Sequence, residues 1–83
     1  MKAYVIQTVS DDGRARFLVK NREKFRMFWS GTIDRDRNCF ASPAMACRSL
    51  NALIKAMPEY LLYEIVLLRL NDDNTVTALS KIN

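Results

Sequence analysis

The sequence predicts an α+β fold, in which an antiparallel sheet of four to five strands carries one helix packed on one face. Several short segments alternate apolar and polar residues, which is typical of half-buried strands. One later segment instead repeats apolar residues at helical spacing. A chain of 83 residues is long enough for one small core, so we expect a single domain over residues 1–83 with the element order β-β-β-α-β-β.

The chain is expected to open with a β-hairpin. Residues 3–9 alternate in polarity and form the first predicted strand. Residues 11–13 read Asp-Asp-Gly, a turn in which Gly13 can adopt a positive φ. Residues 15–20 alternate again and form the predicted return strand.

The next segment is expected to add a third strand and then a loop. A polar connection over residues 21–24 leads to an aromatic, alternating strand over residues 25–30. Residues 31–38 are predicted to form a charged loop or a short widened hairpin. Residues 39–40 add a brief strand before the helix.

The helix is predicted from Ser42 to Met57. Serine is a favoured N-cap, and Pro43 fits the first helical position because its missing N–H would be unpaired there. Pro58 ends the helix. One apolar stripe faces the core and consists of Ala46, Leu50, Leu53, Ile54 and Met57.

The C-terminal segment is expected to complete the sheet. Residues 61–70 are apolar on both faces, which indicates a central strand covered by the helix on one side. Residues 71–74 form a turn, residues 75–79 a short last strand and residues 80–83 a frayed tail. The helix leaves the other sheet face uncovered, so that face is either solvated or an interaction surface.

Catalytic and metal chemistry is not expected. The chain has no histidine, which removes the commonest general base and metal ligand. Cys39 and Cys47 are expected to be reduced and buried, not a zinc or redox pair. The Asp pairs at 11/12, 34/36 and 72/73 are interpreted as turn residues, and Ser42 as a helix cap. We therefore expect no enzyme, no catalytic residues, no cofactor and no metal.

The apolar segments do not suit a membrane protein. The short apolar run at the N-terminus alternates with polar residues, and no stretch approaches the ~20 apolar residues that span a bilayer. Two cysteines suit a reducing compartment. We expect a cytoplasmic protein, a monomer or homodimer, with no membrane partner.

Positive charge is concentrated in one region. The chain has 13 Lys and Arg against 9 Asp and Glu, a formal net charge of +4. Residues 14–37 hold eight of the basic residues and three of the acidic ones. Such a region is suited to an acidic protein surface or a polyanion, although it could also be a solvated face. The predicted partner-binding residues are Arg14, Arg16, Lys20, Arg26, Trp29, Arg35 and Arg37.

A resemblance adds to this interpretation. Trp29, the helix opening over residues 39–44 and the hydrophobic strand over residues 63–66 follow one another in a β-meander, helix and strand order. This pattern resembles small orphan proteins of bacteriophages and prophages, some of which are anti-CRISPR inhibitors. That resemblance implies a protein that binds a host effector complex and blocks DNA access without catalysis. Many anti-CRISPR proteins are acidic, whereas this chain is basic, so it would bind an acidic protein surface or the effector's nucleic acid.

Three functions are therefore considered. The first is a small non-enzymatic protein-binding inhibitor or regulator of phage or mobile-element origin, which acts on a host protein or nucleoprotein complex in the bacterial cytoplasm. The alternative is a small basic nucleic-acid-binding protein. The third is a structural or assembly module.

Overall fold

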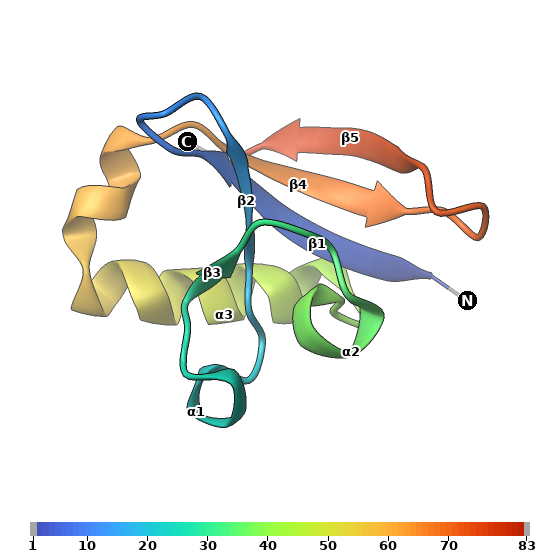
Figure 1. Ribbon diagram of the computed structural model, residues 1–83, viewed down its shortest axis with the longest axis horizontal. Coiled ribbons are helices and arrows are strands. Elements are labelled where there is room, and N and C mark those ends of the chain that lie inside the picture. Colours follow the sequence, from blue (N-terminus) through green and yellow to red (C-terminus); the bar gives the residue numbers. More distant parts are fainter. Residues whose placement is uncertain (1, 83) are drawn as a thin grey trace.

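In the computed structural model, which describes residues 2–82, an antiparallel sheet carries α3 on one face (Figure 1). The strands are β1 (Ala3–Val9), β2 (Ala15–Leu18), β3 (Trp29–Ser30), β4 (Ile65–Leu70) and β5 (Val76–Lys81). The helices are α1 (Arg22–Phe25), α2 (Arg35–Asn38), α3 (Pro43–Ala56) and the 3-10 helix η1 (Pro58–Leu62). Within the described residues the sheet has five strands in the order β3-β2-β1-β4-β5, which confirms the predicted fold class.

The centre of the sheet is the pairing of β1 with β4. The two strands are antiparallel and in register from Ala3 opposite Leu70 to Thr8 opposite Ile65. Successive residues of each strand point to opposite faces, so both faces of this pair receive apolar side chains. As predicted, β4 is a central strand with apolar residues on both faces.

The helix α3 packs against the face that carries Ile6 and Leu67. Its N-cap is Ser42, whose Oγ accepts a hydrogen bond from the Met45 N–H at 3.2 Å. Leu50 is fully buried in the same cluster as Ile6 and Leu67. The cap and the apolar stripe therefore lie where the sequence predicts them. The helix ends at Ala56, and Met57 is its C-cap.

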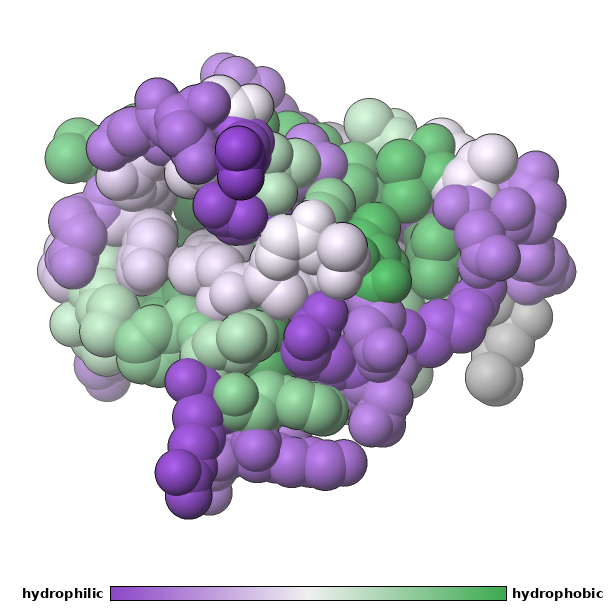
Figure 2. Space-filling model, viewed as in Figure 1, coloured by the Kyte–Doolittle hydropathy of each residue, from purple (hydrophilic) through white to green (hydrophobic). Residues whose placement is uncertain are grey.

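The opposite face of the sheet is partly covered, which corrects the expectation of an uncovered face. Ile33, in the segment before α2, and Cys39, just after it, pack against a buried cluster that includes Val5 and Leu68. Beyond this cover, hydrophobic surface is visible over β4 and β5, next to the hydrophilic turn that joins them (Figure 2). The segment from Ile33 to Cys39 therefore covers part of the sheet face opposite to α3.

The predicted third strand over residues 25–30 is shorter than expected. Only Trp29 and Ser30 pair with β2, opposite Leu18 and Phe17. Phe25 instead ends the helical turn α1, and residues 26–28 form an irregular connection to β3. The turn is capped by the Asn21 side chain, which accepts from the Lys24 N–H at 3.1 Å. A side-chain cap such as Asn21 stabilises a helical turn at the expense of strand pairing. Here the capped turn forms, although residues 25–30 alternate in polarity as a strand would.

The predicted strand over residues 61–70 begins later, at Ile65. Pro58 opens η1 because its fixed φ suits a first helical turn, so the strand cannot start until this turn ends. Leu62 is consequently 88% exposed instead of lying in the sheet.

The C-terminal strand is longer than expected. β5 continues to Lys81, which lies opposite Val66, after an irregularity in the register beside β4. Residues 80 and 81 of the predicted frayed tail therefore belong to the sheet, and residue 83 lies outside the described residues. As an edge strand, β5 pairs with β4 alone, and its six side chains are exposed.

Residues 31–38, predicted as a loop or hairpin, contain the short helix α2, which one buried amide holds in place. Asn38 is fully buried, and its Nδ2 donates to the Leu18 carbonyl oxygen at 3.0 Å and to Ser30 Oγ at 2.9 Å. Its Oδ1 accepts from the Asp34 N–H at 2.9 Å. Phe40 then pairs with Tyr4 through two backbone hydrogen bonds, which corresponds to the brief strand predicted there.

Candidate functional site

Four of the predicted partner-binding residues line two separate hollows, one near each end of β1. Arg16 and Trp29 line a pocket together with Thr8, near the end of β1. Lys20 and Arg35 line a different hollow together with Ala3, at the start of β1. The structure therefore does not gather all of these residues into one surface.

The pocket near the end of β1 is the stronger candidate for a binding site. It has a volume of about 230 Å³. Its lining residues come from β1, β2, β3, η1 and the segments that follow β1 and η1. We call it the aromatic pocket, and it is lined by Thr8, Ser10, Arg16, Trp29, Tyr60 and Tyr63.

Three aromatic rings form one side of the aromatic pocket. The ring centroids of Trp29 and Tyr60 are 5.4 Å apart at an interplanar angle of 53°, and those of Tyr60 and Tyr63 are 6.1 Å apart at 43°. The indole Nε1 of Trp29 is buried and has no hydrogen-bond partner among the described residues. Buried polar atoms without a partner are uncommon, and this donor sits on the ring that lines the pocket.

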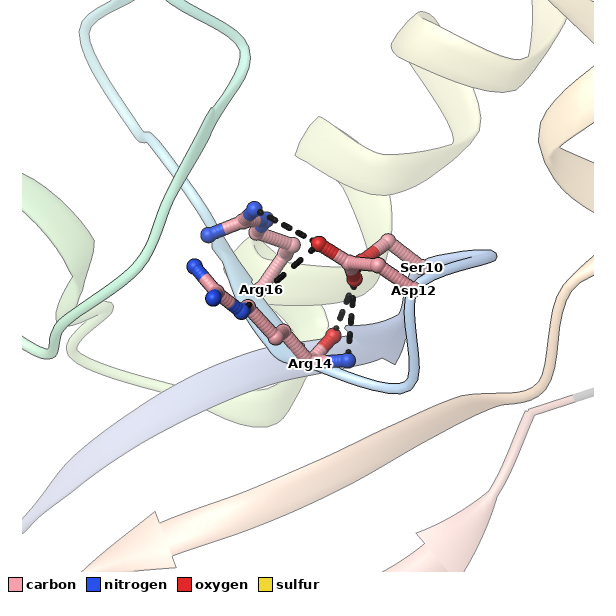
Figure 3. A network of polar contacts seen from close by, with 4 residues as sticks. All are labelled: Ser10, Asp12, Arg14 and Arg16. Carbon is pink, nitrogen blue, oxygen red and sulfur yellow. Dashed lines mark hydrogen bonds and ion pairs between the residues drawn. The ribbon is translucent and has the colours of Figure 1, made fainter.

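Asp12 organises the arginines beside the aromatic pocket (Figure 3). Its carboxylate accepts hydrogen bonds from the Ser10 hydroxyl and from the Arg14 N–H. The guanidinium groups of Arg14 and Arg16 lie 3.8 Å and 3.6 Å from the same carboxylate. The Ser10 hydrogen bond lowers the pKa of Asp12, with the Arg14 backbone acting in the same direction, so this carboxylate stays ionised at neutral pH.

Arg16 and Tyr63 are each positioned by a neighbour. A Cβ at Gly31 would lie 3.1 Å from Arg16 Nη1, so the absence of a side chain there lets the guanidinium lie close to the backbone. The Tyr63 hydroxyl donates to Asp11 Oδ2 at 3.4 Å, and the negative charge of Asp11 raises the pKa of the Tyr63 phenol. Both side chains thus present defined polar groups at the aromatic pocket.

The remaining predicted residues serve the structure around α1 and α2. Arg35 donates to the Asn71 carbonyl oxygen at 3.3 Å and so contacts the β4–β5 turn. Arg37 donates to Thr32 Oγ1 at 3.1 Å, and its carbonyl accepts from the Lys20 N–H. Arg26 follows α1 with a φ of 56°, and its N–H closes that helical turn.

Sequence reasoning missed Tyr60 and Tyr63. The pattern over residues 61–70 predicts Tyr63 in a strand, because apolar residues on both sides outweigh the polar Glu64 that follows it. The available signal was Pro58: a proline can open a new helical turn, and in a 3-10 helix residues three apart lie on one side. That spacing places Tyr60 and Tyr63 on a common side of the chain.

The interpretation of the acidic residues as turn residues is confirmed for three of them. Asp12, Asp34 and Asp73 each accept a backbone N–H two residues further on, at 2.9 to 3.0 Å. Cys39 is buried and Cys47 half-buried, and both are free thiols. Within residues 2–82 there is no group of three or more Cys, Asp or Glu side chains that could hold a metal ion.

Comparisons with known proteins add no relative: no family model, no curated protein and no solved structure matches this chain. None of the helices in the described part of the chain is both long and apolar enough to cross a membrane.

Proposed function

We propose that this chain is a small non-enzymatic protein-binding inhibitor or regulator, which contacts its partner through the aromatic pocket and the adjoining residues of η1. The observation that carries this proposal is that Trp29, Tyr60 and Arg16 line one open pocket. Trp, Tyr and Arg are the residues that most often dominate the energetics of protein interfaces. A pocket of this size accepts a single anchoring side chain of a partner.

The residues that follow Tyr60 in η1 add exposed apolar area next to the aromatic pocket. Leu61 and Leu62 follow Tyr60 in η1 and are 52% and 88% exposed. Neighbouring exposed leucines beside an aromatic pocket resemble the apolar centre of an interface. Because Leu62 is almost fully exposed, its side chain contributes to binding far more than to folding.

The charge around the aromatic pocket favours a protein over a nucleic acid as the partner. Arg14 and Arg16 share the carboxylate of Asp12, and Asp11 lies beside Tyr63. Positive and negative groups therefore alternate around the pocket. A polar rim of mixed sign surrounding an apolar centre is typical of protein interfaces, whereas a nucleic-acid backbone requires a surface of one sign.

The resemblance to phage-encoded inhibitors makes effector complexes of bacterial defence the first partners to test. In this form of the proposal, the protein acts in the cytoplasm of a bacterial host cell and covers the surface through which the effector receives DNA. Inhibition then requires binding alone, without a catalytic group.

The test compares two exposed leucines. The protein is immobilised, incubated with a nuclease-treated bacterial lysate, and the retained protein is identified and purified. Leu62→Glu should weaken binding to that protein by about tenfold or more. The matched control Leu79→Glu, at a leucine 42% exposed on β5, should change the affinity by less than about twofold. Equal effects of both substitutions, or the absence of any retained protein, would contradict the proposal.

A further inference from the structure

A second surface, at the start of β1, has a different character from the aromatic pocket. Two hollows of about 420 Å³ and 600 Å³ adjoin there, and Lys20 and Phe40 line both of them. Lys2 and Arg35 line the first hollow, and Arg48 of α3 lines the second. We call the two together the cationic groove.

The charge of the cationic groove is of one sign. Among the described residues that line the two hollows, four are Lys or Arg and none is Asp or Glu. The Arg35 guanidinium donates to two uncharged oxygens, the Asn71 carbonyl and Asn74 Oδ1, so its charge is not neutralised there. Elsewhere Arg14, Arg16 and Lys24 lie within 4 Å of a carboxylate. The cationic groove therefore gathers four cations from distant parts of the chain without a carboxylate among its own lining residues.

The backbone beneath the cationic groove is held in place. The Lys20 N–H donates to the Arg37 carbonyl oxygen at 2.8 Å, and Phe40 exchanges two backbone hydrogen bonds with Tyr4. The Phe40 ring is buried and is only 6% exposed. Arg22 donates to Ser49 Oγ at 3.2 Å and so adds a further cation at the wall of the second hollow. The backbone at Lys20 and the guanidinium groups of Arg22 and Arg35 are therefore held by hydrogen bonds at the edge of a concave surface.

We propose that the cationic groove binds the phosphate backbone of single-stranded nucleic acid. Cations gathered along a concave path neutralise successive phosphates and release their counterions, which supplies the binding energy. A flexible single strand can follow both hollows, whereas a duplex, with its persistence length of about 150 base pairs, is too stiff to bend into them. Because the Phe40 ring is buried, it cannot stack on a base, so the groove contacts the strand through ion pairs with its phosphates.

The cationic groove is separate from the surface proposed to bind protein. Ala3 lines the groove and Thr8 lines the aromatic pocket. Ala3 and Thr8 are five residue steps apart along an extended strand, a distance of about 17 Å. The two sites can therefore be occupied together, as in a complex that contains both protein and nucleic acid, and each can be tested without the other.

The experiment measures the fluorescence anisotropy of a labelled oligonucleotide of about 12 nucleotides between ~50 and ~200 mM NaCl. The double variant Lys20→Glu/Arg48→Glu should weaken binding by about tenfold or more at ~50 mM salt. It should also reduce the slope of log affinity against log salt by about 1.4, because each lost phosphate contact removes about 0.7. The control Lys55→Glu/Lys81→Glu makes the same change in net charge at two exposed residues that line neither hollow. It should weaken binding by less than about threefold.

Three results would overturn the proposal. One is an equal loss in both double variants, which would show that net charge alone attracts the strand. Another is tighter binding of a duplex of the same sequence, and the third is equally effective competition by a poly-glutamate peptide of the same charge. If the reversal variant does not fold, Lys20→Ala/Arg48→Ala removes the same cations without adding carboxylates. Leu62→Glu should leave oligonucleotide binding unchanged, so failure of one site is distinguishable from failure of the other.

Discussion

Replacing Asn38 with alanine should destabilise the protein by about 2–4 kcal/mol. The buried amide makes three hydrogen bonds of 2.9 to 3.0 Å, which join α2 to β2 and β3 and close the turn at Asp34. Each such bond contributes about 0.5–1.5 kcal/mol to stability, and a buried group left without its partner costs about 1–3 kcal/mol. Alanine leaves the Asp34 N–H without this acceptor and opens a space at a fully buried position. The α2 segment can relax and give some of the freed groups new partners, so the expected loss lies at the lower end of these contributions taken together.

The assay is urea denaturation at neutral pH, followed by circular dichroism and by Trp29 fluorescence, with the free energy of unfolding extrapolated to water. The matched control is Asn51→Ala at an exposed position of α3, where alanine is a better helix former. The control should change stability by less than about 0.7 kcal/mol, in the stabilising direction. If Asn38→Ala costs less than about 0.5 kcal/mol, the three hydrogen bonds do not hold α2, and the reasoning is refuted.

Three further predictions concern the core, the first turn and the carboxylate beside the aromatic pocket. Leu50→Ala should cost about 2–5 kcal/mol in chemical denaturation because Leu50 is fully buried beneath the sheet, and a loss under ~1 kcal/mol would show that α3 packs loosely. Gly13 has a φ of +79° with no atom within 4 Å of a new Cβ. Gly13→Ala should therefore cost about 1 kcal/mol from backbone strain alone, measurable by calorimetry. Asp12 should titrate by NMR with a pKa below its ordinary value of 3.8, since the Ser10 and Arg14 hydrogen bonds favour the carboxylate. Its contribution to stability is present above that ordinary pKa and is lost as the pH falls through the lowered pKa of the folded state; a midpoint at or above 3.8 would contradict the network.

The helix α3 could be predicted from the sequence because independent signals agree on it. Ser42, Pro43 and Pro58 mark its ends, and the apolar stripe gives its buried face. The boundary of β4 could not be predicted in the same way. Apolar residues predominate from Leu61 to Leu70, with Glu64 and Arg69 as the two charged positions. Pro58 signals that a helical turn can open there, but the local pattern does not show how far that turn, η1, extends into the apolar run. Where a turn ends depends on the packing of Tyr60 against Trp29, a contact between distant segments.

Which of the basic residues lie together could not be predicted from the sequence, for a related reason. Arg16 and Lys20 share one face of the predicted return strand, but β2 ends at Leu18, and the two side chains face different hollows. The groove also recruits Lys2 and Arg48, which are far apart in the sequence and outside the basic region. Local charge density identifies where cations are frequent; it does not identify which of them the tertiary fold brings together.

The edge strand β5 has a consequence for handling the protein in solution. Its outer row of backbone N–H and C=O groups is open to any extended segment of another molecule, and Lys81 is the one charged side chain along it. Repulsion between copies that each carry a net charge of +4 opposes such edge-to-edge contact at low ionic strength. Added salt screens this repulsion while leaving the open backbone groups in place. Concentrated samples should therefore stay clear longest in dilute buffer and become turbid as salt is raised.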